Sequence, residues 1–550
     1  MDRRTFLLAA GAAGAAGATA ASAGAFWHWL EIPATVQAPG RDLGHLLRNR
    51  RDLPPPRAQF EADVVILGSG AAGLAAAWRL AREGHRNFIL VGGPEPHGNL
   101  AAGAAGELRY PTGAHYLPLP SRESTHVRDM LSDFGVILDG AQTDRPYYDE
   151  RYVVHAPESR VLFDGVWHDG LIPTDTLPYA EREEQRRFFA LIDILAAARG
   201  RDGRRAFAVP LDAATRDPTW RALDGASFAA WLDREGYRGR VLRAYLDYAC
   251  RDDYGRGCDE VSAYAGLHYF ASRVGEAANA ERGAVLTWPE GLGALAQRLH
   301  AACGFASPAS TATPKPWWLD GMAVSLRREA AGVEVLCVAP GTGGLETRRI
   351  RARRAICAMP LHVAAHVLDG LHDFGFDVRE HMPAHAPWLV ANFVLAGFPA
   401  ELPGAALAWD NIVHGSANLG YVVSTHQDLR AGPPPRTVFT SYCALADLSP
   451  PAARKWMENA PPGELLERAS ADLRTAYGWK LGAVCEGASI TLRAHAMAVP
   501  SPGYLANPGL RALREADGPL QFAHADLSGY SVFEEAAWWG ECCARRVLSA

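Results

Sequence analysis

A strand, a glycine turn and a helix follow one another in DVVILGSGAAGLAAAWRLAREG, residues 63–84, and this pattern constrains the fold most. The run before the turn is apolar and β-branched, as is typical of a buried parallel strand. Gly68, Gly70 and Gly73 form a GxGxxG pattern. The first allows a tight turn, the second lets backbone approach a pyrophosphate, and the third lets the helix pack on the strand. We therefore expect a dinucleotide site at a helix N-terminus.

The end of the second strand leaves the identity of the dinucleotide open. The strand NFILV ends at Val91, and Gly92 stands where a carboxylate normally binds the adenosine ribose. Glu95, in the following loop, could reach back to the ribose or could be a solvated loop residue. NAD, NADP and FAD all use this motif, so other segments must decide between them.

Length and charge favour a large globular protein with a small-molecule ligand. The 550 residues are 48% hydrophobic, which predicts a large core and two or more domains. A formal net charge of -6 leaves no basic surplus, so a nucleic-acid partner is not expected. The nine cysteines contain no CxxC pair, so the sequence predicts no metal site and leaves disulfide pairing open.

The N-terminus resembles a twin-arginine export signal. Arg3 and Arg4 precede an uncharged run rich in Ala and Gly, and Ala21-Ser22-Ala23 is a small-residue cleavage site. We expect 1–23 to be a signal that engages the twin-arginine machinery and sends the folded protein to the periplasm. An uncleaved membrane anchor is the alternative. Residues 24–60 include the charged, Pro-rich RNRRDLPPPRAQ and are expected to be a linker.

Further segments resemble one family. They are GGPEPHGN, YPTGAHYLPLP, SFAAWLDREG, LTWPEGLGALAQRL, GVEVLCV with RRAICAMP, and GPLQFAHADLSGYSVFEEAAWWGECCARRVL. In this order and spacing the chain resembles the flavin-containing amine oxidase superfamily, which includes monoamine and polyamine oxidases, protoporphyrinogen oxidase and phytoene desaturases. The resemblance implies FAD as cofactor. No cysteine falls at a flavin-attachment position, so we expect noncovalent FAD.

The resemblance also implies the domain organisation. We expect an α/β fold with a Rossmann-type FAD-binding domain built from 61–120, 276–370 and 501–550. Inserted between these parts is an α+β substrate domain, with a helical part over 121–275 and a sheet part over 371–500.

Residues that contact FAD are implied by position in the family's motifs. They are Gly68, Ser69, Gly70, Ala71, Ala72 and Gly73 of the turn, Glu95, Gly98 and Asn99 of the next loop, Gly113, Ala114 and His115 beside the flavin ring, and Asp526, Ser531 and Val532 near the C-terminus. The family's Gly-Gly-Arg is reduced here to Gly98-Asn99, so its arginine is missing. His115 could line the pocket or be a structural histidine in a turn.

The C-terminal segment predicts a strand and a capped helix. LQFAHAD reads as a strand ending at Asp526, where the family places an acid that hydrogen-bonds FAD. Ser531 to Glu534 is an S-x-x-E capping box, and the helix after it carries a stripe of small residues. In the family this helix points its positive end at the flavin.

Pocket residues are harder to assign. Tyr442 and His495 are candidates for the substrate pocket, with packing or turn roles as the alternative. We expect 251–254, Arg-Asp-Asp-Tyr, to be a surface loop with internal salt bridges rather than a pocket wall. HMPAHAPWLVANFVLAG contains no lysine, although several amine oxidases use one near the flavin.

The expected function is FAD-dependent oxidation of an amine by hydride transfer, with O2 or a quinone as electron acceptor. One alternative is a desaturase or dehydrogenase of an apolar substrate that passes electrons to a quinone. The other is a protein that keeps the fold as a binding module without turnover. Gly92 and the missing lysine motivate that last possibility.

Overall fold

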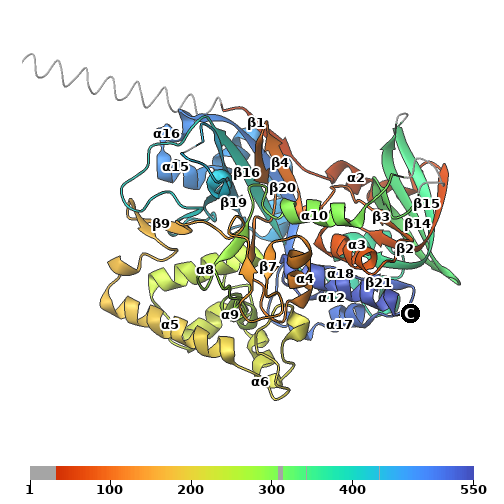
Figure 1. The fold of residues 1–550 in the computed structure, drawn as a ribbon, viewed down its shortest axis with the longest axis horizontal. Helices are drawn as coiled ribbons and strands as arrows, with labels where there is room; N and C mark the ends of the chain where they lie inside the picture. The colour runs from red at the N-terminus through yellow and green to blue at the C-terminus, as the bar shows by residue number, and fades with distance from the viewer. Residues whose placement is uncertain (1–31, 308–313, 342–343, 433, 550) are drawn as a thin grey trace, which may run out of the picture.

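The computed structural model describes residues 32–307, 314–341, 344–432 and 434–549. Within these residues two large sheets lie in two lobes, and helices from both termini pack around the first of them (Figure 1). The predicted signal peptide, residues 1–23, lies outside the described residues. Among the described residues, no helix is long and apolar enough to cross a membrane.

The first sheet is built from strands far apart in sequence. Its order is β12, β3, β2, β15, β14, β13, with β21 beside β15. The strand bounds are β2 Ala58–Leu67, β3 Phe88–Val91, β12 Trp317–Leu319, β13 Met322–Glu329, β14 Gly332–Gly341, β15 Gly344–Cys357 and β21 Leu520–Phe522. β2 runs parallel to β3 and β15, and β15 runs parallel to β21. This is the parallel core expected of a dinucleotide-binding domain.

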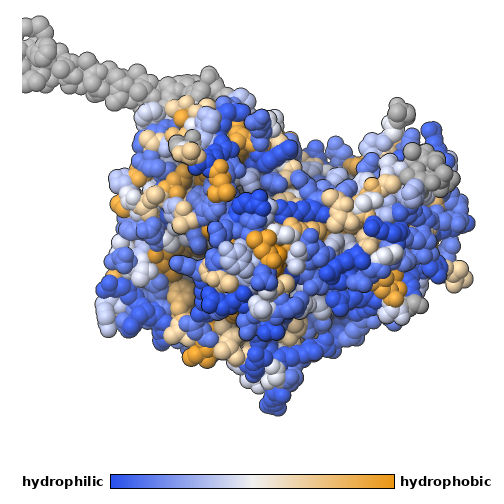
Figure 2. Space-filling model, in the orientation of Figure 1, coloured by the Kyte–Doolittle hydropathy of each residue, from blue (hydrophilic) through white to orange (hydrophobic). Residues whose placement is uncertain are grey.

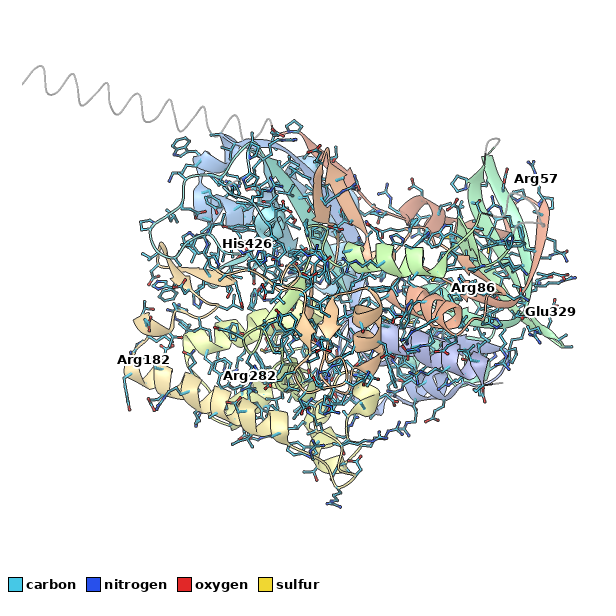
Figure 3. The ribbon with its side chains drawn as sticks, in the orientation of Figure 1. Arg57, Arg86, Arg182, Arg282, Glu329 and His426 are labelled. Carbon is cyan, nitrogen blue, oxygen red and sulfur yellow. The ribbon has the colours of Figure 1, made fainter. Side chains whose placement is uncertain are left out.

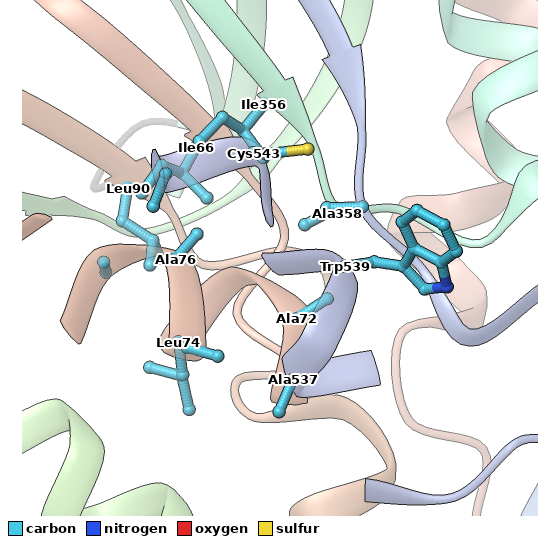
Figure 4. Packing of buried hydrophobic residues seen from close by; sticks show 14 of the residues in the cluster. Ile66, Ala72, Leu74, Ala76, Leu90, Ile356, Ala358, Ala537, Trp539 and Cys543 are labelled. Atoms are coloured by element: carbon cyan, nitrogen blue, oxygen red, sulfur yellow. The ribbon is translucent and has the colours of Figure 1, made fainter. Parts of the chain in front are cut away.

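Helices α3 (Ala71–Arg82), α10 (Gly293–Cys303) and α18 (Phe533–Leu548) cover this sheet. Gly540 of α18 packs so closely on α3 that a Cβ there would lie 2.0 Å from the Ala72 carbonyl oxygen. Figure 4 shows Ala537 and Trp539 of α18 beside Ala72, next to the sheet residues that form the core. The predicted stripe of small residues therefore packs on a neighbouring helix, and not mainly on the sheet. Arg86 donates to the Cys303 carbonyl oxygen at 2.6 Å and ties the end of α10 to the loop before β3 (Figure 3).

The second sheet has the order β1, β20, β16, β19, β18, β17, β9, β10. Its strands are β1 Ala34–Gln37, β9 Ser159–Phe163, β10 Val166–Asp169, β16 His385–Leu395, β17 Asp410–Val413, β18 Tyr421–Val423, β19 Thr437–Cys443 and β20 Cys485–Ala498. Helices α13 (Pro450–Asn459), α14 (Pro462–Ala469) and α15 (Ala471–Tyr477) contribute apolar side chains to the core on one face of this sheet.

A group of helices faces the other side of this sheet. It contains α5 (Tyr179–Ala197), α7 (Phe228–Arg234), α8 (Arg240–Tyr254) and α9 (Ala263–Ala271). On α5, Phe188, Ile192 and Leu195 are buried at helical spacing, so one stripe of this charged helix faces the core. Ser227 caps α7 by accepting from the Ala230 amide at 3.2 Å. The face shown in Figure 2 is mostly hydrophilic, with small scattered hydrophobic groups.

Two boundaries differ from those expected. The described part of 24–60 is not a linker, because β1 forms the edge of the second sheet and α2 (Arg41–His45) follows it. β1 was not predicted because it is only four residues long and precedes a charged, Pro-rich stretch. Within 121–275, β9 and β10 extend the second sheet, and α4 (Thr125–Asp133) packs against α18. The segment expected to be helical therefore contributes strands to the second sheet and a helix beside α18, in addition to the group of helices described above.

Candidate functional site

The glycine turn has the geometry that the sequence predicts. Gly68 has a φ of 106°, and a Cβ there would lie 2.9 Å from the Ala358 carbonyl oxygen. A Cβ on Gly73 would lie 1.8 Å from the Gly68 carbonyl oxygen, so helix and strand could not approach. By contrast, nothing lies within 4 Å of a Cβ built on Gly70. The middle glycine therefore leaves open space in front of the α3 N-terminus, where a pyrophosphate can approach backbone amides.

The other turn residues are internal to the protein. The Ser69 hydroxyl donates to the Gly92 carbonyl oxygen and accepts from the His97 amide at 2.9 Å. It is buried, so it ties the turn to the end of β3. Ala72 is buried against Gly540, while Ala71 is half-buried at the start of α3.

A tryptophan explains the glycine at the end of β3. A Cβ on Gly92 would lie 2.8 Å from Cζ2 of Trp318. Trp318 donates from Nε1 to Asp320 at 2.9 Å and packs against the His97 and His300 rings. The indole therefore covers the position where an acidic side chain would start, and Gly92 is required by packing.

Glu95 does not extend toward the end of β3. Its carboxylate accepts two hydrogen bonds from Arg493 of β20, at 2.9 and 3.0 Å. Arg493 also donates to the Thr112 carbonyl oxygen at 2.7 Å and to Asn99 Oδ1 at 3.2 Å. The interpretation of Glu95 as a solvated loop residue is wrong, since its side chain is 18% exposed and ion-paired. An arginine stands beside Gly98-Asn99 after all, but it comes from a strand almost 400 residues later.

Replacing Glu95 by Ala should lower the free energy of unfolding by about 1–3 kcal/mol, because the buried Arg493 guanidinium would lose its partner. Urea denaturation measures this change. Glu95→Gln, which keeps two polar atoms near Arg493, should lose less. Equal stability of Glu95→Ala and the parent chain would contradict a structural role for the pair.

The loop after β5 (Leu108–Pro111) links the turn to a cavity. A Cβ on Gly113 would lie 2.2 Å from the Asn99 carbonyl oxygen, which also accepts from the Ala114 amide at 2.9 Å. Tyr442 donates to the Gly113 carbonyl oxygen at 3.1 Å, and its ring stacks on His115 with centroids 4.5 Å apart. Two of the predicted pocket residues, His115 and Tyr442, therefore lie together.

A cavity of about 290 Å³ lies against this loop, between the second sheet and helices α8 and α9. Its walls are aromatic and acidic. Its aromatic lining is His115, Tyr116, Tyr245, Tyr248, Tyr269, Phe270, Trp409 and Tyr442, and its acidic lining is Glu158, Asp252 and Asp410. Glu158 and Gly283 are exposed and mark where the cavity opens. No lysine is among its lining residues, in agreement with the sequence.

Burial shifts the protonation of the cavity acids. Burial, together with the charge of Asp253, raises the pKa of Asp252 to about 7, and the Tyr116 hydroxyl donates to Asp252 at 3.2 Å. Burial and the charge of Asp252 raise the pKa of Asp410 to about 8. Among the described residues no cationic side chain forms an ion pair with Asp252 or Asp410. Arg273 also lines the cavity, but it pairs with Asp253 at 2.6 Å.

The prediction of a surface loop at 251–254 is wrong. These residues form the last turn of α8, and Asp252 faces the cavity. Arg251 pairs not within this segment but with Asp247, one turn earlier in α8, at 2.9 Å. Asp410 was not among the predicted site residues. It follows Trp409 at the start of a strand in WDNIV, and the alternation of polar and apolar residues in that strand cannot distinguish a cavity wall from a surface.

His495 does not line the cavity. It lies with His362 and His385 beside Asp526, on the other side of β20. Asp526 is 1% exposed and accepts from the Leu361 amide at 2.9 Å, and His385 Nε2 lies 3.2 Å from the same carboxylate oxygen. His524 Nδ1 lies 3.2 Å from the other oxygen and accepts from the Asp526 amide at 3.1 Å. Histidines therefore enclose the acid that the resemblance assigns to FAD.

The capping box at 531–534 is absent. Val532 is the N-cap of α18 and has no side-chain cap hydrogen bond. Ser531 accepts instead from the Ala498 amide at 2.9 Å, so it joins α18 to the end of β20. The Ser531 hydroxyl therefore accepts from a distant amide, that of Ala498, and not from the nearby amide of residue 534 that a capping box would use.

Comparisons with known proteins agree with this geometry. Residues 66–134 match the family model of an NAD(P)-binding Rossmann-like domain. A putrescine oxidase, solved as wild type bound to putrescine, is similar over 90% of this chain and 100% of its own, with 16% identity and a TM-score of 0.58.

Two further solved structures are similar at the same level. Cyclohexylamine oxidase from Brevibacterium oxydans IH-35A is 18% identical over 89% of this chain and 99% of its own, with a TM-score of 0.59. A fatty acid isomerase from P. acnes is 15% identical over 88% and 98%, with a TM-score of 0.55. The chain therefore has the α/β fold shared by these solved structures, with an NAD(P)-binding Rossmann-like domain matched over residues 66–134.

Proposed function

We propose that this protein is an FAD-dependent oxidoreductase that oxidises a cationic amine. The observation that carries the proposal is the pair Asp252 and Asp410, which face an aromatic-lined cavity beside the Gly113–His115 loop and form no ion pair with a cationic side chain of the described residues. Buried carboxylates are stabilised by an opposite charge, and aromatic faces attract cations. An ammonium group satisfies both requirements. That two similar structures are oxidases of putrescine and cyclohexylamine supports this choice.

The residues present fit a dinucleotide at the glycine turn. Gly70 leaves space before the first amides of α3, and the Gly113 loop brings backbone close to Asn99. Gly68, Gly70, Ala71 and Asn99 would hold FAD, with Arg493 as the nearest cation. No carboxylate is available at Gly92, and Glu95 is already paired, so backbone rather than an acid would contact the adenosine ribose.

When bound, FAD supplies the acceptor for the two electrons and the hydrogen lost from the carbon next to the amine nitrogen. The protein must first hold the amine and remove its extra proton. Asp252 suits that task, because a pKa of about 7 lets a carboxyl exchange protons near neutral pH. Asp410 also faces the cavity, and a second ammonium group beside it would favour its ionised form, because a nearby opposite charge lowers the pKa of a carboxyl. Burial lowers the pKa of His115 to about 3, so this histidine lines the cavity as an uncharged side chain at neutral pH.

The alternative of an apolar substrate fits the cavity less well. Asp252 and Asp410 would have to lose water without gaining a cationic partner. A non-catalytic binding module fits the same cavity, and is motivated by Trp318 over Gly92 and by the missing lysine. The experiment below separates the three.

Protein purified without denaturant should show the two visible absorption bands of oxidised flavin. Under anaerobic conditions a diamine should bleach them, a monoamine should do so less completely, and a neutral alcohol of equal length should not. Absence of flavin would overturn the oxidoreductase, and flavin that no amine bleaches would overturn amine oxidation. Reoxidation by O2 or by a quinone then identifies the acceptor.

We also propose that the protein is exported folded to the periplasm through its Arg3-Arg4 signal. A cofactor inserted in the cytoplasm would explain the use of the twin-arginine machinery, which carries folded proteins.

A further inference from the structure

Three histidines from different elements meet outside the cavity. His362 is the second residue of α11 (Leu361–Val367), His385 opens β16, and His495 lies near the end of β20. One ring nitrogen from each lies within 4.8 Å of the others. The cavity and the glycine turn use none of them.

An irregularity in the sheet brings His495 to this place. β16 and β20 pair regularly up to Trp388 opposite Arg493, and pairing resumes with Ala386 opposite Met497. Residues 494–496 therefore stand opposite a single residue of β16. Bulges of this kind redirect side chains and are common beside functional sites. Here the bulge places the His495 ring on His362, with centroids 4.2 Å apart.

The cluster has an unused acceptor. Nδ1 of His362 is buried and has no hydrogen-bond partner among the described residues. An imidazole nitrogen with a free lone pair in a polar cluster can bind a metal ion. A buried polar atom without a partner is also uncommon in a native protein.

Asp526 orients the second histidine. Asp526 is 1% exposed, and its carboxyl group lies against the His385 ring. A carboxylate only accepts, so His385 Nε2, at 3.2 Å, carries the hydrogen. In the neutral ring the lone pair is then on Nδ1. A carboxylate behind a histidine is the usual outer shell of a metal ligand. Asp526 also accepts from the Leu361 amide and so fixes the start of the helix that carries His362.

We propose that His362, His385 and His495 form a binding site for a divalent transition-metal ion, with zinc as the best match. Three imidazoles suit zinc, and three protein ligands leave a fourth position for water. His495 is exposed, so that position would open to solvent. The site does not rest on the proposed oxidase function.

The test uses the full chain as purified, dialysed against a chelator and then against buffer. Calorimetric titration with Zn²⁺ should give one site per chain, and Co²⁺ should produce the visible bands of a tetrahedral site. His495→Ala should weaken zinc binding at least tenfold without affecting folding, because this side chain is exposed. His362→Ala should do the same. His366→Ala is the matched control, since His366 is exposed on the same helix one turn later, and should bind zinc as the parent chain does.

Two results would overturn the site. One is a parent chain that takes up no zinc, and the other is uptake that His495→Ala and His362→Ala leave unchanged. Flavin is quantified in the same samples by absorbance after denaturation. Failure of the metal site is therefore distinguishable from failure of the oxidase proposal, which depends on flavin and not on zinc.

Discussion

Asp410→Asn should lower kcat/KM for a diamine by about 30-fold or more, because truncating one partner of a buried charge pair costs about 2–5 kcal/mol and each 1.4 kcal/mol is about tenfold. Asparagine keeps the shape of the side chain but cannot ionise, whereas Asp410 would ionise beside a bound ammonium group, because a nearby cation lowers the pKa of a carboxyl. The loss should appear mainly in KM and should be smaller for a monoamine. Steady-state kinetics with both substrates measures it.

The same substitution should stabilise the fold, and this opposite sign separates binding from structure. The folded protein holds the Asp410 carboxyl neutral up to a pKa of about 8, whereas the unfolded chain ionises near pH 4. The parent chain therefore loses stability as pH rises from about 4 to 8, by up to about 1.4 kcal/mol per pH unit. Thermal unfolding should show a gain for Asp410→Asn that is absent at pH 4 and largest at pH 8.

Asp169→Asn is the control for both measurements, because Asp169 is an exposed residue of the same sheet and lies outside the cavity. It should change neither kinetics nor stability. A variant Asp410→Asn with unchanged kcat/KM for diamines would show that the cavity does not use this carboxylate for substrate.

Gly70→Ala should remove most of the bound flavin and leave the fold intact. The Gly70 backbone is extended, with φ of -68°, and a Cβ would meet no protein atom within 4 Å. The methyl group would instead enter the space before α3 that a pyrophosphate needs. We expect flavin per chain to fall at least tenfold, while the free energy of unfolding of the flavin-free protein changes by less than about 0.5 kcal/mol.

Two further variants serve as a control and as a comparison for Gly70→Ala. Gly463→Ala, in α14, also meets nothing within 4 Å and should keep its flavin. Gly73→Ala should lose both flavin and stability, because its Cβ would lie 1.8 Å from a backbone oxygen. Full flavin retention by Gly70→Ala would place the cofactor away from the glycine turn.

Local patterns in the sequence predicted the dinucleotide turn well. Strand, turn and helix are contiguous at 63–84, and the atom that excludes a side chain at Gly73, the Gly68 carbonyl oxygen, lies in the same short stretch. The pairing of His115 with Tyr442 was not predicted as such, although both were candidates, because it depends on where β19 lies relative to the loop at 113–115.

The interactions that could not be predicted from the sequence are contacts between residues far apart along the chain. Glu95 is paired by Arg493, Gly92 is covered by Trp318, and Asp526 is enclosed by histidines from two other segments. In each case the residue type was noticed and its partner was not, because the partner lies far away in sequence. Asp252 was misassigned for a related reason. A run of charges at a helix end is usually solvated, and only the packing of α8 against the sheet turns one of them inward.

Strand β1 ties the order of synthesis to the completion of the fold. Ala34 pairs with Ala488 at the edge of the second sheet, so the first described strand finds its partner only when nearly all of the chain has been made. Contacts between such distant residues form late, since a long loop must close first. Docking of β1 thus reports on a finished protein. If the proposed signal just before β1 directs export, docking of β1 would be one of the last folding steps to precede it.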